Sequence, residues 1–370
     1  MAKIPLRLWL IGLVLVCWLI AELIGLRGVD KSPIYLYATS LLLAIGLFGS
    51  TVGIDRAEAK TNKRIIIAAI TIGVLLKALL IGGVLYLATK NPLFLVLGVA
   101  VAQIDPLSVA TLMGDKRMSP RVKSILASWA SFDDPITVIL VVYAAAVATN
   151  SFGLGERIGQ TANVSSGLFS YGLDLGLNFA LAALAYLCWR TLKNRPWALA
   201  VCLGLLAVIA VWQFLMLGVA IAGLFVRPQW VLAIVGRVTT WALMISGALL
   251  GLLLVNGISL GYGVLLGLMA FIAQIVAAIA LTRGLPRVDR VHLALAQQNG
   301  ITAIILALRL EVQFEGAVAV IAPAILVTNV THFVANWLVD RGWRSASQAE
   351  VEQRADGHDQ RPDQIPAGGD

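Results

Sequence analysis

Two neighbouring aspartates, Asp133 and Asp134, lie in the middle of a long apolar stretch. Residues 124–148 read SILASWASFDDPITVILVVYAAAVA, and these aspartates are the only acidic or basic side chains among them. An aspartate at bilayer depth costs about 2.5–3.5 kcal/mol on insertion, so a membrane helix rarely carries two together unless a cation or a proton binds there. The pair is therefore a candidate site for a monovalent cation and for protons.

The two carboxylates cannot serve one narrow site equally. Successive helix residues point about 100° apart, so we expect one aspartate to face the ion and the other to face a packed neighbour or a water path. Because a carboxylate can hold either a proton or a metal cation, competition between the two would be a minimal exchange mechanism. The alternative is a structural role, in which an aspartate caps a helix break or pairs with a buried lysine. For one aspartate this role is as plausible as a functional one, but for both together it is less plausible.

Two short segments resemble each other and each combines polar residues with a helix breaker. Residues 102–108 read AQIDPLS and residues 296–302 read AQQNGIT. Proline removes a backbone N–H, and glycine tolerates non-helical dihedral angles. Two interrupted helices that run in opposite directions predict an inverted repeat with two crossed discontinuous helices and a site between them. The alternative is chance similarity between apolar segments.

Polar residues within these two breaks are the expected supporting residues of the site. Asp105 would balance the positive end of a half-helix, with direct ion contact as its second role. Gln103 and Ser108 would offer oxygens to a cation or satisfy unwound backbone. Gln298 and Asn299 occupy the second break.

One basic residue, Lys77, lies deep within an apolar segment. A lysine buried in a membrane usually pairs with an acid, and the available partners are Asp105, Asp133 and Asp134. Gln274 lies within one turn of the position that mirrors Lys77 in the second half, but its side chain cannot titrate.

The composition defines a polytopic membrane protein. The 370 residues are 59% hydrophobic and 13% charged, with a mean hydropathy of +0.88, which excludes an ordinary soluble domain. Most of the apolar segments reach the roughly 20 residues that a membrane-spanning helix needs. We expect an all-α fold of about twelve spans, at residues 5–26, 34–54, 65–88, 93–113, 124–149, 166–189, 197–212, 213–226, 235–255, 259–282, 291–308 and 317–340.

The basic residues orient these spans. With both termini in the cytoplasm, twenty of the 28 lysines and arginines fall in inner loops and five in outer loops, as the positive-inside rule predicts. Merging the short seventh and eighth spans into one would reverse the orientation of every later span and would spoil this charge distribution. The net charge of +8 then reflects loops that face anionic lipid, so we expect no nucleic-acid partner.

The chain divides into a transmembrane domain, residues 1–342, and a polar tail, residues 343–370, expected to be disordered and cytoplasmic. The three cysteines, Cys17, Cys188 and Cys202, lie in apolar spans without ligand spacing, and we expect them to be packing residues. No resident cofactor is expected. The only metal would be the transported cation, held by Asp133 and Asp134.

These motifs resemble those of the monovalent cation/proton antiporter superfamily, over about residues 47–340. Residues 105–109 (DPLSV) resemble its Asp-Pro break, and residues 131–134 (SFDD) resemble the motif of the branch with two adjacent aspartates in the fifth span. Residues 218–223 (GVAIAG) are similar to its glycine-containing stretch.

The resemblance implies specific roles. Asp134 would bind the cation and the proton, Asp133 would be its partner, and Asp105 would balance the half-helices. It also implies a homodimer in the cell membrane, in which a core domain moves against a dimerisation scaffold. Ile104 stands where members often have threonine. Gln274 stands where many carry a basic residue that bonds the first aspartate, a role that Lys77 would have to fill from the mirrored helix.

The leading hypothesis is exchange of Na⁺ or K⁺ for H⁺ by alternating access, and the protein is not expected to be an enzyme. One alternative is a sodium-coupled symporter for an organic anion, for which Lys77 is the sole basic candidate. The other is an intramembrane aspartyl protease. Such a protease needs two acids on separate helices, and adjacent residues on one helix do not converge on one water. Asp105 with Asp133 could in principle form such a pair, and a peptide-cleavage assay would test it.

Overall fold

The computed structural model describes residues 6–52, 60–61, 63–106, 109, 118–153 and 164–359, and every regular element in this part of the chain is helical. Seven of the described helices are long and apolar enough to cross a membrane, and α1, α11 and α12 are shorter apolar helices. An all-helical membrane fold, as predicted, follows from these lengths and from the hydropathy.

The first half of the chain contains α1 (Leu6–Ile24), α2 (Pro33–Val52), a helical segment with two π-helical turns (Lys63–Thr89), α7 (Leu93–Ala100) and α9 (Pro120–Phe152). A short 3₁₀ turn, η1 (Val29–Lys31), leads into α2. The helix α9 begins at Ser119, whose hydroxyl accepts a hydrogen bond from the Val122 N–H, a standard N-cap.

The second half contains α10 (Val164–Leu192), α11 (Pro196–Trp212), α12 (Met216–Phe225), α13 (Gln229–Leu253), the 3₁₀ turn η4 (Leu254–Asn256), α14 (Leu260–Leu281), α15 (Arg287–Ala294), α16 (Ile301–Glu311) and α17 (Ala317–Asp359). Each of the twelve predicted spans overlaps one of these helices or one of two interrupted segments. The short seventh and eighth spans are separate helices, because the chain turns between α11 and α12, where Phe214 has a φ of 56°.

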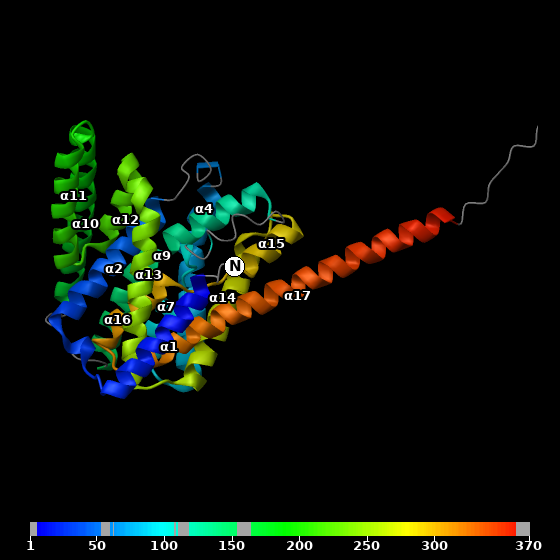
Figure 1. Cartoon of the computed structure of the whole chain (residues 1–370), viewed down its shortest axis with the longest axis horizontal. Coiled ribbons are helices and arrows are strands. Elements are labelled where there is room, and N and C mark those ends of the chain that lie inside the picture. Colours follow the sequence, from blue (N-terminus) through cyan, green and yellow to red (C-terminus); the bar gives the residue numbers. More distant parts are fainter. Residues whose placement is uncertain are drawn as a thin grey trace, which may run out of the picture.

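The helices pack as a bundle whose apolar core is shared by both halves of the chain. Close helix pairs are α14 with α17, α1 with α13, and α2 with α12. The helices α10 and α11 stand side by side at one edge of the bundle, and α17 extends beyond it on the other side (Figure 1). The largest cluster of buried apolar side chains draws on α2, α7, α9, α14, α16 and α17, so it surrounds the two interrupted segments.

The third predicted span is irregular around Lys77. It consists of α4 (Lys63–Ala68), η2 (Ala69–Gly73), α5 (Val74–Ala78), η3 (Leu79–Gly83) and α6 (Val84–Thr89), in which η2 and η3 are π-helical. Such turns often occur at functional sites. Next to η3, Gly98 of α7 packs so closely on the Gly82 backbone that a Cβ at residue 98 would collide with it. The two glycines therefore bring α7 against the segment that carries Lys77.

Two expectations differ from the structure. Residues 343–359, predicted to be disordered, continue α17 as a helix to Asp359; they are rich in Ala, Glu, Gln and Arg, which favour helix, and contain no proline. Residues 360–370 lie outside the described residues. Cys188 of α10 and Cys202 of α11 form a disulfide because these two helices pack against each other, so only Cys17 remains a packing cysteine.

Candidate functional site

The two predicted breaks meet inside the bundle. The helix α7 ends at Ala100 and α15 ends at Ala294, and in each case a short non-helical stretch follows. The Asp105 N–H donates to the Gln298 carbonyl at 2.8 Å, and the Ile301 N–H donates to Asp105 Oδ1 at 3.2 Å. Asp105 therefore places its carboxylate at the positive end of α16.

Gly300 makes this close approach possible. Its backbone (φ −144°, ψ −130°) is neither helical nor extended immediately before α16, and a Cβ at residue 300 would collide with the Asp105 carboxylate. The glycine thus allows the second break to approach the Asp105 side chain of the first.

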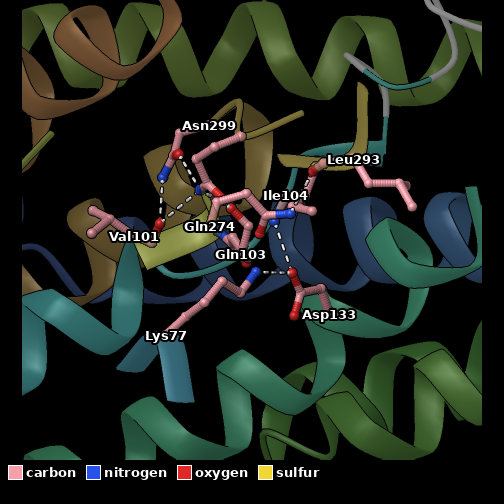
Figure 2. A network of polar contacts seen from close by, with 9 residues as sticks. Lys77, Val101, Gln103, Ile104, Asp133, Gln274, Leu293 and Asn299 are labelled. Carbon is pink, nitrogen blue, oxygen red and sulfur yellow. Dashed lines mark hydrogen bonds and ion pairs between the residues drawn. The ribbon is translucent and has the colours of Figure 1, made fainter. Parts of the chain in front are cut away.

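Amide side chains hold the unwound backbone together. Gln297 Nε2 donates to the carbonyls of Gln103 at 2.7 Å and Val101 at 3.2 Å, and Asn299 Nδ2 donates to the same Val101 oxygen at 3.0 Å (Figure 2). Asn329 of α17 accepts a hydrogen bond from the Asn299 N–H at 3.1 Å and donates to the Asn299 carbonyl at 2.8 Å. These bonds replace the helical ones that each break loses.

Asp133 is bound to the first break and to Lys77. Its Oδ2 atom lies 2.7 Å from Lys77 Nζ and accepts a hydrogen bond from the Ile104 N–H at 3.1 Å (Figure 2). Neither the lysine nor the aspartate side chain is exposed. Lys77 Nζ also lies 5.4 Å from the ring centroid of Trp129, a distance typical of a cation–π contact. The sequence left three acids as possible partners of Lys77, and in the structure Lys77 pairs with Asp133.

Asp134 faces the second break and has neutral hydrogen-bond partners. Its Oδ2 atom accepts from the Thr302 hydroxyl at 2.8 Å. With the Gln103 amide oriented to satisfy its neighbours, Gln103 donates to Asp134 Oδ1 at 3.0 Å and accepts from the Ala303 N–H at 2.7 Å. Asp134 is also fully buried. The two aspartates therefore point to different surroundings, as their helical spacing predicted.

The charges of this cluster do not balance. Asp105, Asp133 and Asp134 contribute three carboxylates, all within electrostatic reach of one another or of Lys77, and Lys77 contributes one ammonium group. If all four groups were ionised, the described cluster would be short of positive charge. A cation or protons arriving at the pair would reduce that imbalance.

The other predicted supporting residues lie around this centre. Gln298 and Asn299 are buried in the second break. Gln274 of α14 is buried, and its Nε2 atom donates to the Leu293 carbonyl at 3.0 Å, so it fixes the end of α15 (Figure 2). Ser108 lies outside the described residues.

Sequence reasoning did not select Thr302, Gln297 or Asn329 as site residues. A signal for the first two was present, because Thr302 matches Ser108 and Gln297 matches Gln103 in the repeated segments. Asn329 comes into contact only through the packing of α17 on the second break, which no local pattern reveals.

A bundle of apolar helices in which two interrupted segments meet beside buried acids is the architecture of many secondary transporters. The sodium proton antiporter MjNhaP1 from Methanocaldococcus jannaschii has the same fold. One solved structure of it, at pH 8, aligns with a TM-score of 0.63 and 16% identity, over 88% of this chain and 92% of that one. A second, from an electron-microscopy map, aligns with a TM-score of 0.61 and 16% identity, over 90% and 89%. No protein-family model and no curated protein matches the sequence.

Proposed function

We propose that the protein exchanges a monovalent cation, Na⁺ or K⁺, for protons across a membrane, with Asp134 as the carboxylate that binds each in turn. The observation that carries the proposal is the difference between the two aspartates. Asp133 forms an ion pair with Lys77, whereas Asp134 is buried at the junction of the breaks with neutral partners. An acid without a bound cationic side chain is the better site for a mobile cation.

The groups around Asp134 suit a small hard cation. Such ions bind oxygen ligands, and the Thr302 hydroxyl and the Gln103 amide, once rotated, would add oxygens to those of the carboxylate. The proton and the cation compete for the same oxygens, so each excludes the other. Opening the junction alternately to the two sides of the membrane would then couple their movements.

Asp133, Lys77 and Asp105 have a supporting role in this proposal. Lys77 and the Ile104 N–H hold the Asp133 carboxylate away from Asp134, and Asp105 holds the start of α16. We further propose that the transporter works as a homodimer in the cell membrane with both termini in the cytoplasm. The distribution of basic loop residues supports the orientation. The resemblance of the motifs to the monovalent cation/proton antiporter superfamily supports the dimer.

The two alternatives are less well supported. A symporter for an organic anion would need a basic side chain available to the substrate, and Lys77 is bonded to Asp133. A protease would need two carboxyl groups that converge on one water, whereas Asp133 and Asp134 bond to different groups.

The proposal predicts that purified protein in liposomes dissipates a pH gradient when Na⁺, K⁺ or Li⁺ is added, and that Asp134→Asn abolishes this flux. The asparagine keeps the size of the side chain and one of its two hydrogen-bond acceptors, but it can no longer exchange a proton for a cation. Glu315→Gln, which removes an exposed acid from the turn between α16 and α17, is the matched control and should retain wild-type flux.

Cation-dependent proton flux that persists in Asp134→Asn with unchanged pH dependence would refute the assignment. Uptake of a labelled organic anion that depends on Na⁺ but not on pH would favour the symporter instead.

A further inference from the structure

A cavity with apolar walls lies away from the acid pair. It has a volume of about 350 Å³, is open to the outside, and lies between α14, α15 and α17. Ile275 and Ile279 of α14, Leu295 after α15, and Val339 of α17 supply aliphatic walls, and Arg287 and Arg290 of α15 border the cavity, whose surface is almost entirely apolar. An apolar cavity with two arginines at its edge fits an amphiphilic anion, with the acyl chain inside and the anionic group at the edge.

The two arginines have no acidic partner in the part of the chain that the structure describes. No ion pair within the described ranges involves either of them. The Nε atom of Arg290 is buried and makes no hydrogen bond to a described residue. The nearby acid on the same helix, Asp289, is buried and accepts a hydrogen bond from Ser119 of α9 at 3.1 Å. The charge of each arginine is therefore not neutralised by a described acid, and an anion at the edge of the cavity would neutralise it.

The residues beside the cavity on α17 are of the kinds found at a membrane surface. On α17, Val339 lies between Trp337 and Arg341, and the Arg341 guanidinium lies 5.5 Å from the Trp337 ring centroid. Tryptophan with a neighbouring basic residue is typical of the boundary between the hydrocarbon and the headgroups. The positive-inside distribution assigns the loop between α14 and α15 to the cytoplasmic side, where anionic lipids attract basic residues.

We propose that this cavity binds one anionic phospholipid, with its phosphate between Arg287 and Arg290 and an acyl chain along Ile275, Ile279 and Val339. The headgroup is assigned because the positive charge of the two arginines matches the negative charge of the phosphate. The acyl chain is assigned because the cavity walls are aliphatic. A soluble phosphate would use only the arginines. A second protein copy would have to bring an acidic group into the cavity.

The lipid would touch the element that forms the second break. Leu295, which lines the cavity, is the first residue beyond α15. Its carbonyl oxygen accepts a hydrogen bond from Asn336 Nδ2 at 3.2 Å and lies 2.6 Å from His332 Nδ1. A lipid bound in this cavity would therefore stabilise the packing of α15 on α14 and α17, whether or not the protein transports ions.

The test measures lipid binding and thermal unfolding of the full-length protein in detergent, so it does not depend on transport. Wild type is compared with Arg287→Gln/Arg290→Gln, with Ile279→Trp, which fills the apolar wall, and with Arg283→Gln. Arg283 is exposed in the same loop and does not line the cavity. The probes are phosphatidylglycerol, phosphatidylcholine and inorganic phosphate, and bound lipid is counted by native mass spectrometry.

Phosphatidylglycerol, but not phosphatidylcholine or inorganic phosphate, should bind and raise the unfolding temperature of wild type and of Arg283→Gln. The double arginine variant should bind it roughly 30-fold more weakly, at about 1 kcal/mol per arginine, and Ile279→Trp should also lose the stabilisation. Equal binding by the double variant would overturn the proposal. So would full stabilisation by inorganic phosphate, or an unfolding temperature that follows protein concentration instead of lipid.

Discussion

In the proposed mechanism, the ion pair of Lys77 and Asp133 leaves Asp134 as the aspartate that binds the transported ion. Both partners are removed from water, so each depends on the other and on the Ile104 N–H for compensation. Such a pair contributes little net stability relative to neutral residues, but removing one partner leaves an isolated buried charge. We therefore propose a structural role for Asp133, with Asp134 binding the mobile ion.

This account predicts the stability of variants at the two positions. Lys77→Met should destabilise the protein by about 3–5 kcal/mol, because it leaves the Asp133 carboxylate without a cation. Lys77→Met/Asp133→Asn should recover most of that loss, since the asparagine oxygen can still accept from the Ile104 N–H. Thermal unfolding in detergent measures both effects. A double variant no more stable than Lys77→Met would argue against a mutually dependent pair.

The sequence predicts part of this arrangement. The cost of charge in lipid was enough to select Asp133, Asp134 and Lys77 as candidate site residues and to expect an ion pair, which the structure shows between Lys77 and Asp133. It could not choose among three acids for Lys77, because that choice depends on how α5 and α9 approach each other. It also did not identify Thr302 as the partner of Asp134, because the contact joins residues 168 positions apart.

At the scale of elements, the two breaks depend on residues that tolerate close contact. The chain unwinds at residues 101–105 and 295–300, and Gly300 lets the second stretch approach Asp105 without a side chain between them. Proline and glycine at matching positions made the breaks predictable from sequence. The π-helical turns on either side of Lys77 were not, because a π turn has no strong local sequence signal.

Gly300→Ala tests the close contact. The added methyl group should force the Asp105 carboxylate or the start of α16 to move, at a cost of about 1–3 kcal/mol, and transport in liposomes should fall sharply. Gly236→Ala in α13, where an added Cβ meets no described atom within 4 Å, is the control and should be nearly silent. Wild-type flux in Gly300→Ala would show that the junction of the breaks does not need this geometry.

At the scale of the whole molecule, the all-helical fold follows from apolar segments long enough to cross a membrane. Every predicted span corresponds to a helix or an interrupted segment, and the predicted boundary between the short helices α11 and α12 is a real turn. Residues 343–359 form a helix where disorder was predicted, because their helix propensity outweighed their polar character. The fold is shared with a protein that has 16% sequence identity, so it does not depend on the identity of most residues.

The central claim is that a proton and a cation compete for Asp134. The most direct measurement is the Na⁺ concentration that gives half-maximal proton flux in liposomes, determined over a series of pH values. Because a bound proton excludes the cation, this concentration should rise about tenfold for each unit of pH decrease once the site is mostly protonated, and it should level off at high pH. A half-maximal concentration that does not change with pH, in a protein that still transports, would contradict the account.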